Sequence, residues 1–195
     1  MRVKDENKRK LICGKAIEMI VAKGFDGLSM HKLAKAVNIS ASTIYIYFPG
    51  REDLLNQVFN EVQAKFEEDA LAGFDPLMDF EQGLWLQWKN RYRNIVDNPN
   101  AFRFFEQFRN SPLIKHSDIK SNRFRSQLTH FVQKAMDEHK IVTVPIESFW
   151  AIAYGPFYAL IKFHLDQANM ASDRFLLSEK QLRETFKLVI KALKK

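Results

Sequence analysis

The chain has 195 residues, of which 46% are hydrophobic and 13% aromatic, with seven glycines, six prolines and a formal net charge of +7. This composition excludes a disordered chain and favours a compact, helix-rich protein. The single cysteine, Cys13, excludes an internal disulfide framework and fits a reducing cytoplasm, and the charged start MRVKDENKRK is not expected to act as a secretory signal peptide.

Hydrophobic periodicity predicts an all-α fold of about nine helices, with no convincing strand. In the first part of the chain, helices are expected over residues 5–23, 29–37, 41–48 and 51–72. Gly24 ends the first helix, and Ser29 is placed to cap the second. We expect a DNA-binding domain over residues 1–50 and a second helical domain over residues 51–195, with the helix 51–72 linking them.

The second part of the chain is predicted to hold five more helices, over residues 75–97, 101–110, 117–139, 145–169 and 178–194. Asp75 and Asn100 are the expected caps of the first two, and Ser178 with Gln181 forms a capping box before the last. The apolar run from Phe149 to Leu165 is too short and too polar for a confident membrane span, so it is expected to be a buried helix.

The stretch SASTIYIYF, Ser40–Phe48, has the β-branched and aromatic residues typical of a strand. As a helix, however, it places Ile44 and Phe48 on one inward face. Asn38 tolerates the left-handed conformation of a tight turn, and Ser40 is able to cap the helix that follows. The pattern therefore predicts a helix-turn-helix, with a plain helical hairpin or an isolated strand as the alternatives.

The outward residues of this segment suit contact with DNA. Ala41, Ser42 and Thr43 are small enough to let the backbone approach base edges, and tyrosine hydroxyls are able to reach phosphate oxygens. Residues 1–51 contain ten basic and four acidic residues, and no acidic residue occurs from Gly27 to Arg51. This asymmetry favours a module that binds a polyanion, although a solvated charged face is the simpler alternative.

The stretch GLSMHKLAKAVNISASTIYIYFPGREDLL, preceded by Gly24-Phe25, makes residues 8–59 resemble the DNA-binding domain of the tetracycline-repressor (TetR) family of bacterial regulators. The resemblance implies that a recognition helix over residues 41–47 enters the major groove. The residues it places at DNA are Ala41, Ser42 and Tyr45 near the bases, Thr43 and Tyr47 at phosphates, and His31 and Lys32 at the backbone or an edge base. It also implies a phosphate contact for Arg51, where the family commonly has lysine, and allows the basic residues Arg2, Lys4, Lys8, Arg9 and Lys10 to reach DNA.

The resemblance further implies that the second part of the chain binds a ligand and forms a homodimer, through the helices at about 145–169 and 178–194. A dimer calls for a palindromic double-stranded DNA operator, and the effector is expected to be a small apolar or amphipathic molecule. The candidate pocket residues are Trp85, Trp88, Phe105, Phe108, Phe131, Tyr154 and Tyr158. Residues of these types are also ordinary core residues, so a filled core is the alternative.

Other classes of function find little support in the sequence. The five histidines are scattered, and no HExxH motif or nucleophile elbow occurs, so no enzyme, catalytic residue, metal site or cofactor is expected. No membrane partner is expected, and the protein is expected in the cytoplasm. Within the regulator class, a repressor released by its effector is favoured, with an activator or an effector-independent DNA-binding relative as the alternative.

Overall fold

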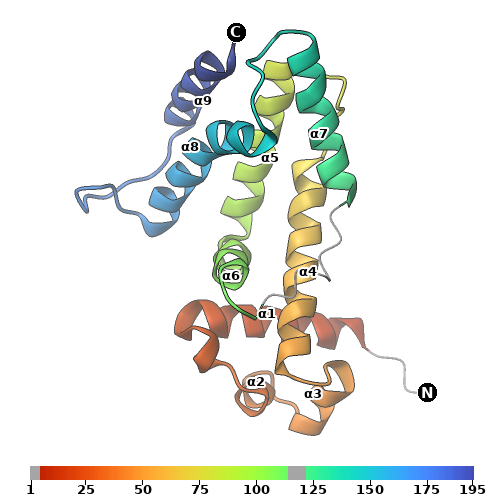
Figure 1. Ribbon diagram of the computed structural model, residues 1–195. Helices are drawn as coiled ribbons and strands as arrows, with labels where there is room; N and C mark the ends of the chain where they lie inside the picture. Colours follow the sequence, from red (N-terminus) through yellow and green to blue (C-terminus); the bar gives the residue numbers. More distant parts are fainter. Residues whose placement is uncertain (1–4, 114–121) are drawn as a thin grey trace. The chain divides into compact units, whose positions relative to one another are not determined.

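The computed structural model of the chain describes residues 5–113 and 122–195 (Figure 1). Over these residues the chain is helical, and the β-structure in the described part consists of two isolated bridges. The elements are α1 Glu6–Lys23, the 3-10 turn η1 Phe25–Gly27, α2 Met30–Ala36, α3 Ala41–Tyr47, α4 Arg51–Ala70, α5 Phe80–Asp97, α6 Pro99–Arg109, α7 Asn122–Asp137, α8 Ile146–Asp166 and α9 Glu179–Leu193. The predicted all-α fold is confirmed.

The helices belong to two compact units. The first unit comprises Met1–Lys65 with Asp97–Lys120, and the second comprises Phe66–Val96 with Ser121–Lys195. The division falls inside α4 and assigns α6 to the same unit as the first three helices. The predicted boundary, between a DNA-binding domain over residues 1–50 and a second domain over residues 51–195, stays a prediction.

The first unit is built around a small apolar core to which each of its helices contributes. α1 packs on α2 and on α6, and α2 packs on α3. Fully buried side chains of α1 to α4 include Ile12, Ile20, Leu33, Ile44, Leu54 and Phe59, and Phe48, directly after α3, joins them. Because α2 and α3 are only seven residues long, this shared core, rather than helix propensity, holds them in place.

Two predicted helix starts in the second part of the chain are wrong. The helix predicted from Asp75 begins at Phe80, because Asp79 accepts hydrogen bonds from the backbone N–H groups of Glu81 and Gln82, while Asp75 stabilises a turn by accepting one from Leu77. Such Asx turns compete with helix formation. The helix predicted from Ala101 with Asn100 as its cap begins at Pro99 instead, since proline is suited to the first helical position.

The remaining helix predictions differ in smaller ways. The predicted start of α7 at Ser117 lies outside the described residues. α8 ends at Asp166 because Gln167 adopts a left-handed conformation with φ of 53°, and Pro156 lies inside this helix. The capping box of α9 is confirmed, since Ser178 and Gln181 bond to each other's backbone N–H groups. No helix in the described part of the chain is long and apolar enough to cross a membrane.

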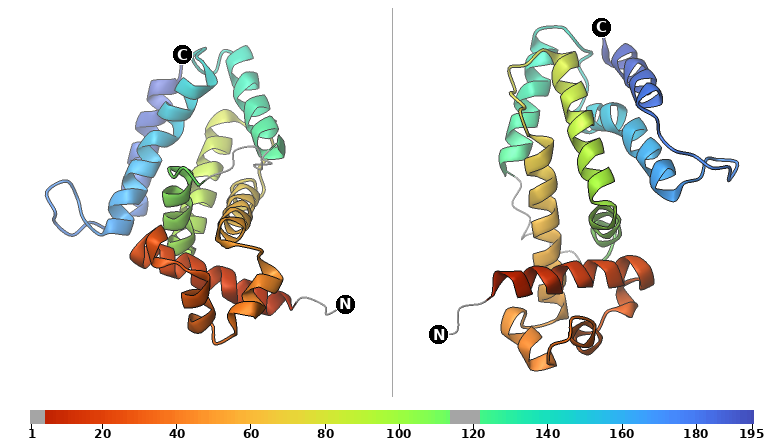
Figure 2. Two further views of the ribbon diagram at one scale, coloured as in Figure 1. Left: turned by 60° about the horizontal axis from the view of Figure 1, so that its bottom comes forward. Right: turned by 180° about the vertical axis from the view of Figure 1, so that it is seen from behind.

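The second unit packs α5, α7, α8 and α9 around aromatic side chains. α8 and α9 lie side by side, as both views of Figure 2 show. The indole N–H of Trp88 on α5 donates to the carbonyl oxygen of Ala153 on α8 at 2.9 Å, and its ring lies 5.3 Å from that of Phe157. Trp88 therefore satisfies its polar atom inside the core, as a buried indole usually does.

Candidate nucleic-acid interface

The turn between α2 and α3 is formed by local interactions that the sequence encodes. Asn38 has φ of 54°, in the left-handed region, and the N–H of Ile39 donates to the carbonyl oxygen of Ala34 at 3.0 Å. The hydroxyl of Ser40 then accepts from the N–H of Thr43 at 3.1 Å and caps α3. The prediction of a helix capped by Ser40, rather than a strand, is confirmed over Ala41–Tyr47, while Phe48, predicted as its last residue, is extended and follows the helix.

The buried face of α3 fixes which side chains are presented outward. Ile44 and Phe48 are fully buried beneath the helix, as predicted. On the other faces, Ser42 is exposed and Ala41 and Thr43 are half-buried. α3 therefore presents small polar residues at its N-terminal end, where the partial positive charge of a helix and its free N–H groups favour an anion.

Two large residues project beyond this small end. Tyr45 is 47% exposed and Ile46 is 54% exposed, and both belong to α3. Ile46 is absent from the predicted DNA contacts, although it lies two residues after Ile44 and so on another face of the helix. An exposed apolar side chain on the outward face of a short helix is suited to contact with a thymine methyl group.

The side chains of α2 extend the exposed surface. His31 and Lys32 are exposed, as is Lys35, which is absent from the predicted DNA contacts. The spacing indicates this position, because Lys35 lies three residues after Lys32 and therefore on the same side of the helix. With no acidic residue between Gly27 and Arg51, these cations belong to a segment of one charge sign.

Tyr47 and Arg51 are already engaged inside the first unit. Tyr47 is only 8% exposed, and its hydroxyl accepts a hydrogen bond from the N–H of Asp5 at 3.2 Å. One terminal guanidinium nitrogen of Arg51, Nη2, donates to the carbonyl oxygen of Phe25 at 2.6 Å. In this arrangement Tyr47 supports α1, and Arg51 is anchored close to the start of α4; their predicted phosphate contacts stay predictions.

The basic residues near the N-terminus do not form an extended arm from Asp5 onward. Lys8, Arg9 and Lys10 lie within α1, whereas Arg2 and Lys4 lie outside the described residues. Arg9 is held against α4, since its guanidinium pairs with Glu61 and donates to Gln57. These contacts hold α1 to α4 within the first unit.

The seven predicted pocket residues are divided between the two units. Phe105 and Phe108 lie on α6 in the first unit, where their rings are 5.2 and 5.0 Å from that of Phe59. The other five lie in the second unit: Trp85, Trp88, Phe131, Tyr154 and Tyr158. Phe131 packs between Phe74 and Phe80, and Trp88 and Tyr154 are fully buried. Their membership of one ligand pocket stays a prediction.

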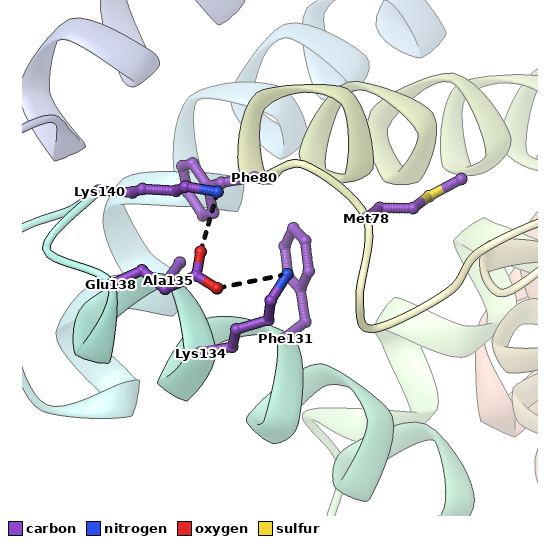
Figure 3. A pocket seen from close by; sticks show the side chains of 7 residues that line it. All are labelled: Met78, Phe80, Phe131, Lys134, Ala135, Glu138 and Lys140. Carbon is purple, nitrogen blue, oxygen red and sulfur yellow. Dashed lines mark ion pairs between the residues drawn. The ribbon is translucent and has the colours of Figure 1, made fainter.

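A shallow depression in the second unit is shown in Figure 3. Its empty volume of about 160 Å³ includes open solvent, and it leaves no enclosed space for even a water-sized molecule, so it is not a ligand pocket. An ion pair between Lys140 and Glu138 at 2.8 Å covers part of it. The residues that line it are Met78, Phe80, Phe131, Lys134, Ala135, Glu138 and Lys140. Only Phe131 belongs to the predicted set, so this depression is not the predicted pocket.

Comparison with known proteins identifies the helix-turn-helix unit. The sequence profile of the family described as bacterial regulatory proteins, tetR family, matches residues 12–58. An uncharacterized HTH-type transcriptional regulator of Haemophilus influenzae is 32% identical over 119 residues, which are 60% of this chain and 63% of that relative. The match thus spans less than two thirds of the length of this curated relative. Regulators of this kind are not enzymes, which agrees with the absence of a catalytic motif.

Solved structures extend the similarity to the whole chain. A TetR family transcription regulator from Marinobacter aquaeolei VT8 has a TM-score of 0.83 and 26% sequence identity, with 100% of both chains covered. A TetR-family transcriptional regulator from Haemophilus influenzae has a TM-score of 0.78 at 23% identity, again over 100% of both chains, and shows the same fold. Residues 12–58 thus match the DNA-binding region of the tetR family of bacterial regulatory proteins, and the whole chain shares the fold of solved TetR-family regulators.

Proposed function

We propose that the protein is a transcriptional regulator that reads double-stranded DNA through α3. The observation that carries the proposal is the outward face of this helix: Ser42, Tyr45 and Ile46 are exposed above a fully buried apolar face. Small hydroxyl and methyl groups suit base edges in the major groove. The exposed His31, Lys32 and Lys35 on α2 supply the basic flank that sequence-independent attraction to phosphates requires.

We further propose that the protein acts as a homodimer through α8 and α9, which correspond to the predicted segments 145–169 and 178–194. Support comes from uncovered apolar side chains on both helices, since Leu188 on α9 is 68% exposed and Ile146 at the start of α8 is 39% exposed. A twofold dimer presents two copies of α3 at a separation of one DNA turn, about 34 Å. The operator is therefore expected to be palindromic.

The regulator is proposed to be a repressor that a small apolar or amphipathic effector releases from its operator, inside the cytoplasm. An effector weakens DNA binding only to the extent that it prefers the conformation that does not fit the operator. An activator, or a regulator without an effector, is the alternative within the same fold. A promoter–reporter assay in a strain with and without the gene distinguishes them, because loss of a repressor raises expression and loss of an activator lowers it.

The test of DNA binding is a gel-shift titration with DNA from upstream of the protein's own gene, repeated over a series of salt concentrations. We expect Tyr45→Ala to reduce discrimination between operator and unrelated DNA. Arg51→Ala is expected to lower the slope of log K against log[salt] by about one, the change for one lost phosphate contact. Lys89→Ala removes an exposed charge from α5 in the second unit and serves as the control. Binding that is indifferent to sequence and unchanged in all three variants would contradict the proposal.

The dimer is tested separately by sedimentation and by the same gel shift. Leu188→Glu introduces a charge on α9 and is expected to yield monomers that bind the operator at least tenfold more weakly. Met170→Glu is the matched control, because Met170 is 87% exposed but lies in the connection after α8 rather than on the proposed interface helices. If Leu188→Glu remains dimeric, the interface lies elsewhere.

A further inference from the structure

The second unit contains a buried cation without a counter-charge. Arg91 on α5 is only 6% exposed, and it forms no ion pair among the residues that the structure describes. One terminal nitrogen, Nη1, donates to the amide oxygen of Gln87 at 2.8 Å. Its Nε is buried and has no hydrogen-bond partner. An unpaired buried charge is costly, so its presence calls for an explanation.

Aromatic rings surround this guanidinium and account for part of its stability. Its central carbon lies 4.7 Å from the ring centroid of Tyr154, 5.4 Å from that of Phe124 and 5.8 Å from that of Trp150. Contact of a cation with ring faces is favourable. It does not satisfy the N–H donors, however, which lie in the plane of the guanidinium group.

Two further polar groups close to Arg91 are buried without partners. Gln87 accepts from Arg91 with its oxygen, but its amide nitrogen, Nε2, has no acceptor. The hydroxyl of Tyr154 is fully buried and also lacks a partner. Burial raises the pKa of Tyr154 to about 12, so this hydroxyl stays protonated at neutral pH and is able to donate. The cluster therefore offers three unused donors and one positive charge, a set that complements an anion with several lone pairs.

The neighbouring helix closes this cluster on one side. Gly83 of α5 faces Phe131 of α7, and Arg91 of α5 faces Phe124 of α7, so the two helices run antiparallel. Phe124 and Trp150 are only partly buried, whereas Tyr154 is fully buried. The two rings are thus the partly exposed members of the cluster, and a ligand would reach the guanidinium by displacing them.

We propose that the second unit binds a small amphipathic carboxylate, with its head group on Arg91, Tyr154 and Gln87 and its apolar body against the rings of Trp150 and Phe124. The carboxylate supplies the missing counter-charge and accepts from Nε of Arg91, Nε2 of Gln87 and the hydroxyl of Tyr154. An alcohol or an ester carries no counter-charge and leaves the cation unpaired. The role of this ligand as the effector that releases DNA rests on the proposed function; the site itself does not.

The test is isothermal titration calorimetry of the full chain at pH 7.5 with octanoate, decanoate and 2-naphthoate. Each acid is compared with its primary alcohol. We expect at least one acid to bind tenfold or more tightly than its alcohol. Arg91→Met is expected to remove this preference. Arg183→Met is the control, because Arg183 also lies over a tryptophan ring, 4.7 Å from that of Trp85, but is exposed. Equal binding of acids and alcohols, no binding of any acid, or unchanged acid binding by Arg91→Met would overturn the proposal.

A purely structural role for Arg91 predicts a different set of results. If the arginine serves a ligand, Arg91→Met keeps or raises the melting temperature, because methionine fills the space without a buried charge. If Arg91→Met fails to fold, the arginine is needed for the structure and this variant gives no binding result. Tyr154→Phe then tests the acid-binding site, since it removes only the hydroxyl. We expect Tyr154→Phe to weaken acid binding at least threefold and to leave alcohol binding unchanged; equal affinity for the acids would overturn the site.

The failure of this inference is distinguishable from the failure of the proposed function. Operator binding by the wild type is measured without any acid present, and it tests the regulator alone. Acid binding that depends on Arg91 in a protein that ignores operator sequence would support the site and refute the regulator. Selective operator binding in a protein that binds none of the acids would support the regulator and refute the acid-binding site.

Discussion

Replacement of Gly83 by alanine tests how closely α5 and α7 approach inside the second unit. A Cβ atom at Gly83 would lie 2.6 and 2.8 Å from two ring atoms of Phe131 and 3.4 Å from Phe74. The ring of Phe131 has little room to retreat, because it is 1% exposed and lies 5.1 Å from the ring of Phe74 and 5.5 Å from that of Phe80. The new methyl group therefore crowds a closed aromatic cluster.

Two effects of opposite sign decide the magnitude. Alanine is favoured over glycine in a helix interior by about 1 kcal/mol. Overpacking a closed core costs about 1 to 3 kcal/mol, so Gly83→Ala is expected to lower the free energy of unfolding by about 1 kcal/mol. Gly14 in α1 is the matched control, since it is exposed and a Cβ there meets no atom within 4 Å. Gly14→Ala is expected to raise the free energy of unfolding by about 0.5 to 1 kcal/mol.

The assay is urea unfolding followed by circular dichroism and by tryptophan fluorescence. All three tryptophans lie in the second unit, so fluorescence reports on Gly83→Ala directly. A double-mutant cycle with Phe131→Leu isolates the crowding, because a smaller partner should restore the normal benefit of alanine at position 83. If Gly83→Ala stabilises the protein as much as Gly14→Ala does, the close approach of α5 and α7 is refuted.

Three further predictions concern the first unit. Burial raises the pKa of Cys13 to about 11, so the thiol should not react with a disulfide reagent at pH 8 until the protein unfolds. The free energy of unfolding should fall as the pH rises from 9 towards 11. Rapid reaction of the thiol in the native protein would contradict its burial. Tyr47→Phe removes the acceptor for the N–H of Asp5 and should lower the free energy of unfolding by about 1 kcal/mol while operator affinity stays the same; a loss of affinity without a loss of stability would instead indicate a phosphate contact. Ser40→Ala removes the cap on the N–H of Thr43 and should cost about 1 kcal/mol in urea unfolding, whereas an unchanged midpoint would show that the cap is dispensable.

The sign of the Cys13 effect follows from linkage. The thiolate is disfavoured in the folded protein, so the folded pKa lies above the ordinary value of 9.0. Below pH 9 the thiol is protonated in both the folded and the unfolded protein, so its contribution to the free energy of unfolding is fully present. That contribution is lost at higher pH, as the unfolded protein releases the thiol proton.

Local structure was predictable from the sequence wherever neighbouring residues decide it. The caps at Ser29, Ser40 and Ser178 and the left-handed turn at Asn38 each involve groups no more than a few residues apart. Each of these interactions is formed entirely by residues within one short stretch of the sequence. The recognition of a helix in SASTIYIYF, despite its strand-like residues, depended on these flanking signals.

The predicted start at Asp75 failed because two similar signals competed. Asp75 and Asp79 both precede residues suited to a first turn, and sequence alone does not rank them. In the structure Asp75 stabilises a turn and Asp79 caps α5. When two local capping patterns are equally strong, the tertiary packing of the segment that follows decides which of them begins the helix.

The sequence by itself determined the helical class, the helix-turn-helix and the inward-facing Ile44 and Phe48 of the α3 segment, because these follow from periodicity, caps and turns. Only the tertiary structure decided that the hydroxyl of Tyr47 meets Asp5, 42 residues away, and that Phe105 and Trp88 belong to different units. It also decided that Arg91 is buried and forms no ion pair with any carboxylate in the described part of the chain. Periodicity states which face of a helix is turned inward; which groups meet there depends on how separate helices pack together.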